Sequence, residues 1–406
     1  MKPTTPVKIY FNQPLLPVLI GLLLLLQLIT PYQGWLVLLV GLGGAWFISR
    51  LWIQSLAQGL QLRRETRFGW AQVGDYLEER FSLTNRGWAR GLGVEIGDRS
   101  NLPGYQAGRM TNIEGHHTLA WQSRGACIRR GLFTLGPAHL RVSDPLGLYT
   151  VTLNHPETNT LMVTPRIVPL PAIQIAPGGR AGEGRLRKRA FDPTVSAAGV
   201  REYFPGAPSQ AIHWPTSARR DTLFVRFFDN TPAGDWWIFL DLEQRVQVGQ
   251  DHHSTAEHGI ILAASLADRG LKLGRAVGLA AYGSELAWLP PWLGDEQRWK
   301  ILRQLALIAP GDLSLAELLA RTRSNLGQFT SLIIITPAVA AEWLTPLLSL
   351  TRRGVVPTIL LLDPLSFGAA GQPKGNSNVA PERLAQLGLA YYLITRDLLD
   401  HPEQSG

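Results

Sequence analysis

Two apolar runs stand almost back to back near the N-terminus, and they constrain this chain more than any other feature. The first run covers 15–29 and the second covers 35–53, with a short turn between them. A helix needs about 20 mostly apolar residues to cross a bilayer. Helices satisfy their own backbone hydrogen bonds in lipid. The sequence therefore predicts two transmembrane helices over 14–53, preceded by a cytoplasmic arm over 1–13.

Charges beside these runs predict their orientation. The turn between the runs has no Lys or Arg, whereas positive residues flank both outer ends, namely Lys2, Lys8, Arg50, Arg63, Arg64 and Arg67. Because positive flanks stay in the cytoplasm, we expect a plasma-membrane protein with two spans and both termini cytoplasmic. A signal peptide is the alternative for the first run, but no small-residue cleavage site follows it.

Aromatic residues near the ends of the runs fit anchors at the membrane interface, namely Tyr32, Trp35, Trp46 and Trp52. A cluster of small residues in the second run, 41–45, would permit close helix approach. That cluster leaves two interpretations open: a homo-oligomer assembled through the spans, or packing of the two spans against each other.

Composition limits the function classes. The 406 residues carry a formal net charge of +8, which suggests attraction to anionic headgroups or to an acidic partner. No nucleic-acid-binding motif occurs, so we expect no nucleic-acid partner. Cys127 is the single cysteine, so no intrachain disulfide can form. The length after the apolar runs predicts two domains.

The first of these domains is predicted to be an all-β, sandwich-like unit over 66–165. Short strand-like runs follow one another there, separated by Gly, Pro, Asn and Asp turns such as 85–87, 136–137 and 144–148. A Pro-, Gly- and Ala-rich stretch over 166–198 then becomes basic and is predicted to be a linker. Its basic residues would be a solvated loop, or they would contact lipid phosphates or an acidic partner.

The second domain is predicted over 234–400 as a doubly wound α/β unit. Apolar runs at 236–242, 331–336 and 355–363 are typical of buried parallel strands, and helical patterns alternate with them. Ser254 and Glu257 form a capping-box pattern at the start of one helix. Ligands of such folds bind beyond the carboxyl ends of the strands, which directs attention to Asp241, Glu243, Thr336 and Asp363.

The segment 199–230 between these regions carries a distinctive pattern: Gly199, Arg201, Glu202, Tyr203, Gly206, Ile212, Trp214, Ser217, Ala218, Arg219 and Arg226. It resembles the hallmark segment of the family called "domain of unknown function 58". Turns upstream and the order of the segments resemble that family too. The resemblance implies a membrane-anchored protein with a von Willebrand factor A-like α/β domain.

The chain departs from the family pattern at several positions. The family's Gly-Asp is Gly206-Ala207 here, and its two arginines are replaced by Gln210 and Ala211. Where von Willebrand factor A domains bind metal, an Asp-x-Ser-x-Ser supplies oxygen ligands, whereas 241–245 reads Asp-Leu-Glu-Gln-Arg. Because a hard divalent cation needs several oxygen ligands, the resemblance implies a degenerate metal site at Asp241, Glu243 and Thr336, and we expect no metal or other cofactor.

Charged and aromatic residues in the hallmark segment admit two interpretations. Arginines paired with carboxylates and stacked on rings would form an inter-domain brace. Arg, Tyr and Trp are also enriched at binding hot spots, so the same residues would form a partner-binding surface: Arg201, Glu202, Tyr203, Trp214, Ser217, Arg219 and Arg226. The histidines at 252, 253 and 258 fit no zinc template and are better explained by the start of a helix.

These observations predict a non-enzymatic adaptor or scaffold that presents its α/β domain at the cytoplasmic face of the membrane. No catalytic nucleophile or phosphate-loop motif occurs. The family resemblance implies a protein partner, a MoxR-type AAA ATPase. The alternative is a hydrolase with an acidic or metal site at Asp241, Glu243 and Asp363, which requires those carboxylates to converge.

Overall fold

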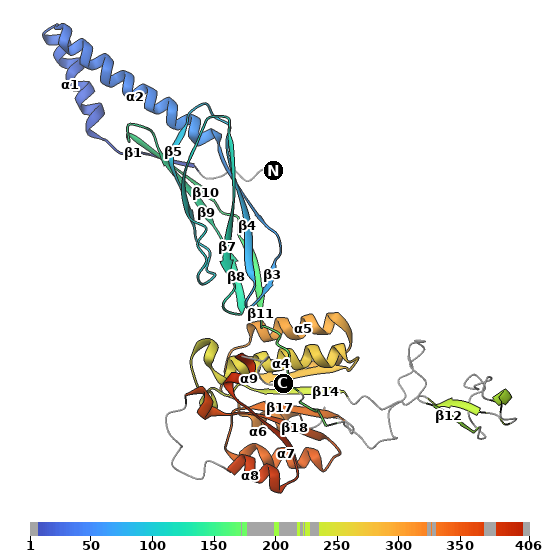
Figure 1. Ribbon diagram of the computed structural model, residues 1–406. Helices are drawn as coiled ribbons and strands as arrows, with labels where there is room; N and C mark the ends of the chain where they lie inside the picture. Colours follow the sequence, from blue (N-terminus) through green and yellow to red (C-terminus); the bar gives the residue numbers. More distant parts are fainter. Residues whose placement is uncertain are drawn as a thin grey trace. The chain divides into compact units, whose positions relative to one another are not determined.

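The computed structural model describes residues 7–171, 173–176, 199–202, 217–219, 222, 224–227, 235–322, 326, 330–368 and 379–400. The chain divides into two compact units, Met1–Arg166 and Ile167–Gly406, which are described separately. Figure 1 shows helices and strands in the first unit and a layered α/β arrangement in the second.

Two apolar helices open the first unit: α1 (Leu15–Ile29) and α2 (Gln33–Gly59). Among the described residues, only α2 is long and apolar enough to cross a membrane, and α1 is a shorter apolar helix. The buried residues of α2 are confined to its second half, Ser49, Ile53, Leu56 and Gly59. The helix runs past the predicted end at 53 because its last turns supply apolar side chains to the β-sheet core.

The segment before α1 differs from the predicted arm. Val7–Phe11 forms strand β1, which pairs antiparallel with β10 (Tyr149–His155) at the edge of a five-stranded sheet. Part of the predicted cytoplasmic arm over 1–13, Val7–Phe11, is therefore a sheet strand, and the cytoplasmic placement of the arm stays a prediction. Alternation in this five-residue stretch was too short to reveal a strand, and the partner strand lies far away in the sequence.

The remaining strands of the first unit form three sheets. The order is β1-β10-β9-β5-β6 in the first, β2-β4-β7 in the second and β3-β11-β8 in the third. Their bounds are β2 (Leu60–Thr66), β3 (Trp70–Gln72), β4 (Tyr76–Asn85), β5 (Gly91–Asp98), β6 (Arg109–Ile113), β7 (Thr118–Ala126), β8 (Gly131–Leu135), β9 (Ala138–Ser143) and β11 (Asn159–Thr164).

The sheet β2-β4-β7 packs against the other two sheets through two apolar clusters. One cluster joins Leu83 of β4 to strands of the five-stranded sheet and to Ile53 and Leu56 of α2. The other joins Phe81 of β4 to the three-stranded sheet and contains Cys127. The layered β-rich unit predicted from the turn signals is thus present, and after β1 its strands continue from Leu60, directly after α2.

The small residues of α2 do not explain how α1 and α2 pack. A Cβ added at Gly41, Gly43 or Gly44 would meet no atom within 4 Å. These glycines therefore border open space, and the interpretation that they serve packing between the two helices is wrong.

A six-stranded sheet lies at the centre of the second unit, in the order β16-β15-β14-β17-β18-β19. Its strands are parallel except for the antiparallel edge strand β16. Their bounds are β14 (Trp236–Asp241), β15 (Val277–Tyr282), β16 (Leu286–Trp292), β17 (Ser331–Thr336), β18 (Val356–Leu362) and β19 (Ala390–Ile394). A separate antiparallel pair is formed by β12 (Gly199–Glu202) and β13 (Phe224–Phe227).

Helices cover both faces of this sheet (Figure 1). They are α4 (Thr255–Lys272), α5 (Gly294–Leu307), α6 (Leu315–Thr322), α7 (Leu344–Thr351), α8 (Val379–Gln386) and α9 (Arg396–Asp400), with short 3-10 turns at η2 (Gln244–Val246), η3 (Asp251–His253), η4 (Ala341–Trp343) and η5 (Pro364–Phe367).

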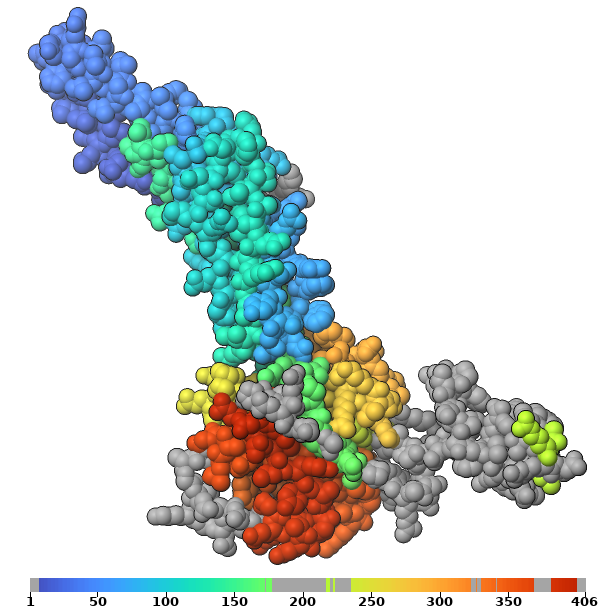
Figure 2. All heavy atoms as spheres, viewed as in Figure 1, coloured from blue at the N-terminus to red at the C-terminus, as the bar shows by residue number. Residues whose placement is uncertain are grey.

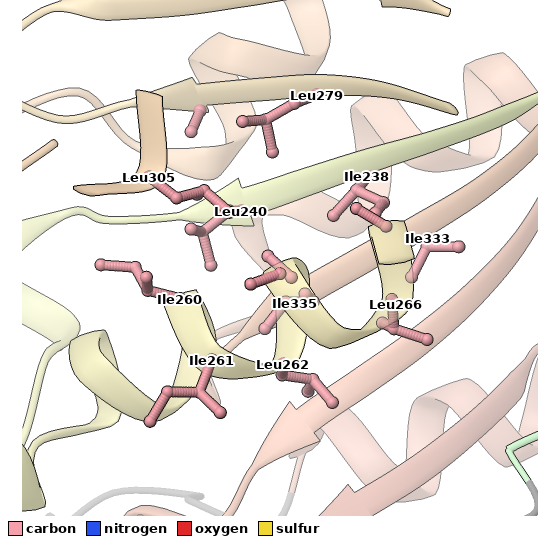
Figure 3. Packing of buried hydrophobic residues seen from close by; sticks show 14 of the residues in the cluster. Ile238, Leu240, Ile260, Ile261, Leu262, Leu266, Leu279, Leu305, Ile333 and Ile335 are labelled. Atoms are coloured by element: carbon pink, nitrogen blue, oxygen red, sulfur yellow. The ribbon is translucent and has the colours of Figure 1, made fainter. Parts of the chain in front are cut away.

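Strand β14 is buried on both faces, which explains why its sequence is apolar without alternation. Ile238 and Leu240 belong to the cluster shared with α4 and α5, which Figure 3 shows. Trp237 and Phe239 belong to the cluster shared with α6 and α7 on the other face. A strand buried on both faces needs apolar residues at every position, which confirms a parallel-sheet α/β unit.

The predicted linker over 166–198 is corrected in its first part. Residues 167–171 and 173–176 lie on the second unit: Val168 N donates to Ser265 Oγ at 3.0 Å, and Ala176 N donates to Thr358 Oγ1 at 3.0 Å. Ile173 is buried in the apolar core. Proline residues stand among these aliphatic residues, and for this reason the sequence pattern predicted a linker. Residues 177–198, with the basic cluster, lie outside the described residues.

Candidate functional site at the carboxyl edge of the parallel sheet

Two polar side chains meet where neighbouring parallel strands end. Asp241 closes β14 and Thr336 closes β17, and these strands pair directly. Thr336 Oγ1 donates a hydrogen bond to Asp241 Oδ2 at 2.6 Å. The Thr336 hydroxyl also accepts from Ala338 N at 2.9 Å. The topology therefore brings together two of the three residues predicted for the degenerate metal site.

The loop after β14 closes over Asp241. Glu243 N donates to Asp241 Oδ1 at 3.1 Å. The Gln247 amide donates to the carbonyls of Asp241 and Glu243 at 3.1 and 3.3 Å. Its oxygen accepts from Thr255 Oγ1 at 2.7 Å. Asp241 is only 3% exposed, so its carboxylate is enclosed and both oxygens already accept hydrogen bonds.

Burial dominates the electrostatics of this carboxyl. Desolvation raises the pKa of Asp241 to about 6, although the hydrogen bonds from Thr336 and from the Glu243 backbone oppose the shift. A cation at this edge would need several oxygen ligands. Arg245, at the position of a family hydroxyl, is exposed and makes no hydrogen bond or ion pair among the described residues. The site is therefore a buried carboxyl with a raised pKa, enclosed by the loop after β14.

Asp363 does not join this group. It follows β18, and its Oδ1 accepts from Leu365 N at 3.1 Å to cap the turn η5. Within the described ranges, no cluster of three or more His, Cys, Asp or Glu side chains could hold a metal ion. The convergence of Asp241, Glu243 and Asp363 that the hydrolase alternative requires is therefore not found there, because the Asp363 carboxylate serves its own turn.

The histidine cluster has structural partners. Ser254 Oγ accepts from Glu257 N at 3.2 Å, which confirms Ser254 as the N-cap of α4. His258 is fully buried, and its Nδ1 lies 3.1 Å from Ser254 O. Arg396 lies 2.7 Å from His253 Nδ1. These contacts agree with the helix-start explanation of the cluster.

The hallmark segment is described only in part. In the β12–β13 pair, Val200 lies opposite Arg226 and Arg201 lies opposite Val225, with Glu202 opposite Phe224. Ser217 is buried, whereas Arg219 in the same short helical stretch is exposed. Tyr203 and Trp214 lie outside the described residues. The choice between a brace and a partner-binding surface stays a prediction.

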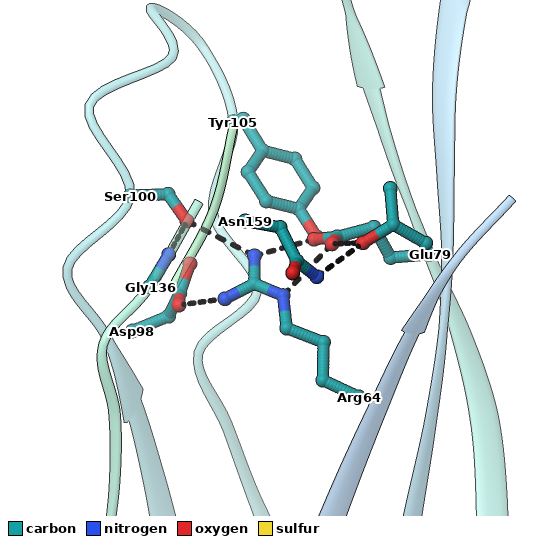
Figure 4. Close-up of polar contacts among 8 residues, drawn as sticks. Arg64, Glu79, Asp98, Ser100, Tyr105, Gly136 and Asn159 are labelled. Atoms are coloured by element: carbon teal, nitrogen blue, oxygen red, sulfur yellow. Dashed lines mark hydrogen bonds and ion pairs between the residues drawn. The ribbon is translucent and has the colours of Figure 1, made fainter. Parts of the chain in front are cut away.

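A buried ionic network in the first unit was not predicted. The Arg64 guanidinium bonds Glu79 through Nε at 2.8 Å and through a terminal nitrogen at 2.5 Å, and it bonds Asp98 at 2.8 Å. Tyr105 donates its hydroxyl to Glu79, and burial raises the pKa of Tyr105 well above its usual value. Figure 4 shows the side chains converging on Arg64.

This network corrects the use of Arg64 as a membrane-flanking charge. The side chains of Arg64, Glu79 and Asp98 are 10%, 0% and 3% exposed, so they are not available to headgroups. The sequence signal that could have revealed the network is the alternation along β2. It places Arg64 on the same inward side as Leu60, Leu62 and Thr66.

These features define a multi-domain chain with an N-terminal helix long and apolar enough to cross a membrane, a β-rich unit and an α/β unit with a largely parallel sheet. Residues 199–367 match the model of the family described as "Protein of unknown function DUF58". This match confirms the resemblance to that family which the hallmark segment carries.

Similarity to named proteins is partial. "Uncharacterized protein YeaD" of Bacillus subtilis (strain 168) is 32% identical over 111 residues, which is 27% of this chain and 26% of that relative. An aerotolerance-related membrane protein from Bacteroides fragilis NCTC 9343 aligns over 43% of this chain and 100% of that one, at 13% identity and a TM-score of 0.29. A CARDB domain from Pyrococcus furiosus covers 26% of this chain and 94% of that one, at 9% identity and a TM-score of 0.20.

Proposed function

We propose that this protein is a membrane-anchored, non-enzymatic adaptor that holds an α/β module of the von Willebrand factor A type at the cytoplasmic face. The observation that carries the proposal is how the apolar helices join the β-rich unit. The strand that precedes α1, β1, is paired with β10 in the β-rich unit. The last turns of α2 are buried in the core of that unit. The side chains of both helices are otherwise largely exposed, as lipid-facing chains would be.

The orientation in this proposal rests on charge. Arg50 and Lys8 flank the helices on the side of the β-rich unit and are exposed, and the turn at 30–34 has no basic residue. Positive flanks favour the cytoplasm, so α1 and α2 would form a hairpin with both termini inside. A helix of 15 residues is short for a bilayer, and local thinning of the bilayer would accommodate it.

The orientation can be tested by thiol labelling in intact cells, because the native Cys127 is buried and is the single cysteine. A membrane-impermeant maleimide should label Gln33→Cys, at the exposed hairpin turn, from outside. The same reagent should label Leu273→Cys, in the second unit, only after the membrane is opened. Labelling of both positions from outside would refute the cytoplasmic placement.

The adaptor role is supported by the closed state of the sheet edge. Asp241, Gln247 and Thr255 satisfy one another, and family resemblance adds the partner class, a MoxR-type AAA ATPase. The exposed Arg219 then belongs to a binding surface.

The test is a crosslinking pull-down from intact membranes with the full chain, Arg219→Ala and a control, Arg303→Ala. Arg303 is an exposed arginine on α5 outside the hallmark segment. We expect an ATPase to be recovered with the full chain and the control and to be depleted by Arg219→Ala. Recovery of no ATPase from any of the three would reject this partner, and equal recovery from all three would favour the brace.

A further inference from the structure

An aromatic and cationic cluster surrounds Tyr149, where the two apolar helices meet the β-rich unit. Trp46 Nε1 donates to the Tyr149 hydroxyl at 2.7 Å. The Arg50 guanidinium carbon lies 5.9 Å from the centre of the Tyr149 ring, and the Phe11 ring lies 4.9 Å from it. Three segments that are distant in the sequence therefore build one cluster: β1, α2 and the start of β10.

The turn that leads into β10 presents an apolar side chain beside this cluster. Asp144 holds the turn by accepting from Leu146 N at 3.0 Å and from Tyr149 N at 2.6 Å, and Gly147 adopts φ +68°. Leu146 is 59% exposed at the tip. The Asn12 amide donates to Gly147 O at 3.0 Å, which ties the turn to the residues that precede α1. Figure 2 shows the green atoms of this turn against the blue atoms of the helices.

The depth of the cluster follows from helix geometry. At a rise of about 1.5 Å per residue, Arg50 lies about 26 Å along α2 from Gln33. The hydrocarbon core of a bilayer is about 30 Å thick. If the hairpin turn lies at one face of the membrane, Arg50 and Tyr149 lie near the other face. This step rests on the proposed membrane hairpin.

A second aromatic pair lies on the other side of α2. The rings of Trp52 and Trp88 meet edge to face at 5.3 Å, and Trp52 Nε1 donates to Arg90 O at 3.1 Å. Trp88 is largely exposed. Tryptophan concentrates at the level of the headgroups because its ring is apolar and its N–H is polar. Two aromatic clusters thus contact α2 near the level of Arg50.

Arg50 and Arg90 differ in their ion pairs. Arg90 pairs with Glu114 at 2.8 Å, whereas no carboxylate among the described residues forms an ion pair with Arg50. Its guanidinium donates to the Gln54 side-chain oxygen at 3.2 Å in the amide orientation that satisfies both groups. An exposed guanidinium that keeps free donors, over a tyrosine ring, matches the geometry with which arginine binds phosphate.

We propose that Arg50, Trp46 and Tyr149 form a binding site for the phosphate of an anionic lipid headgroup, while Leu146 enters the adjoining acyl region. Arg50 supplies the charge, and the Tyr149 ring fixes the guanidinium. The Trp46 N–H holds the Tyr149 hydroxyl. The turn 144–148 has a function in this proposal beyond reversing the chain, because its tip inserts beside the bound lipid.

The test places an environment-sensitive fluorophore on the Leu146→Cys protein, in which Cys127 is buried and unlabelled. The full chain is incorporated into phosphatidylcholine vesicles that contain a small fraction of a spin-labelled lipid. This lipid is either phosphatidylglycerol or phosphatidylcholine, and in both cases it bears a nitroxide high on the acyl chain. Flotation of the vesicles first establishes incorporation. Quenching then measures how much of each lipid lies beside residue 146.

We expect quenching by phosphatidylglycerol to exceed quenching by phosphatidylcholine about fivefold, the factor given by ~1 kcal/mol per cationic residue at an anionic surface. Arg50→Gln should remove the preference while quenching remains, and Arg303→Gln should keep it. Equal quenching by both lipids before any substitution would overturn the headgroup site. An incorporated protein quenched by neither lipid would overturn the insertion of Leu146. Failure to float would instead reject the proposed membrane hairpin.

Discussion

Removing the Arg64 side chain should destabilise the β-rich unit strongly, because the ionic network around it is buried. Arg64→Met leaves Glu79 and Asp98 with no countercharge, and both of these side chains are at most 3% exposed. Breaking a buried ion pair on one side costs roughly 3–5 kcal/mol. The substitution also removes the guanidinium that lies 5.3 Å from the Phe81 ring.

Cys127 provides the assay. It is fully buried in the same apolar cluster as Phe81 and Tyr105, and it is the single cysteine of the chain. When opening is rapid and reversible, its labelling rate follows the population of the open unit. At about 1.4 kcal/mol per tenfold change in that population, Arg64→Met should accelerate labelling about 140- to about 3700-fold at constant pH.

Arg63→Met is the matched control, since Arg63 is the neighbouring arginine on the exposed side of β2. We expect it to change the labelling rate by less than about threefold, as surface substitutions usually do. If Arg64→Met accelerates labelling no more than Arg63→Met, the network contributes little to stability and the reasoning is refuted.

Three further predictions concern other parts of the chain. Because burial raises the pKa of Asp241 to about 6 in the folded state, the free energy of unfolding of the second unit should fall by about 2 kcal/mol as the pH rises from about 4 to about 6. Urea titrations followed by tryptophan fluorescence should lose this dependence in Asp241→Asn. Gly311→Ala should displace the loop after β14, because a Cβ there would collide with the backbone of Gly283; an unchanged hydrogen-exchange rate at Gln244 N, which donates to Gly311 O, would contradict this. Leu56→Ala, in the β core, should cost ~2–5 kcal/mol and speed Cys127 labelling at least about 25-fold, whereas Leu36→Ala, on an exposed part of α2, should leave it nearly unchanged.

The sequence predicted the α/β unit well at strands that are buried on both faces of the sheet. The apolar run at 236–242, which forms β14 over Trp236–Asp241, was recognisable without its partner strands, because burial on both faces removes alternation. The capping box at Ser254 identified the start of α4 within one residue. Strand β16 was missed because it contains Pro290 and Pro291, which are tolerated at a sheet edge but contradict a strand pattern.

The candidate site was predicted less completely. Parallel order brings Asp241 next to Thr336, as strand ends in one sheet require. Gln247 and Thr255, which close the loop, could not be found because their contact depends on where α4 docks against the loop. Arg64 was misjudged because a charged residue close to an apolar helix looks like a flanking charge until its partners, which come from other strands, are known.

The junction between the helices and the β-rich unit has a mechanical consequence. The chain crosses it twice, once as a paired strand at Val7–Phe11 and once as an unbroken helix through Leu56. A single flexible connection would let the β-rich unit swivel freely. Two stiff connections restrict that motion, so in the proposed membrane hairpin a change in bilayer thickness that tilts the helices would tilt the β-rich unit by a similar angle. Lipid composition would thereby set the pose in which the β-rich unit is displayed.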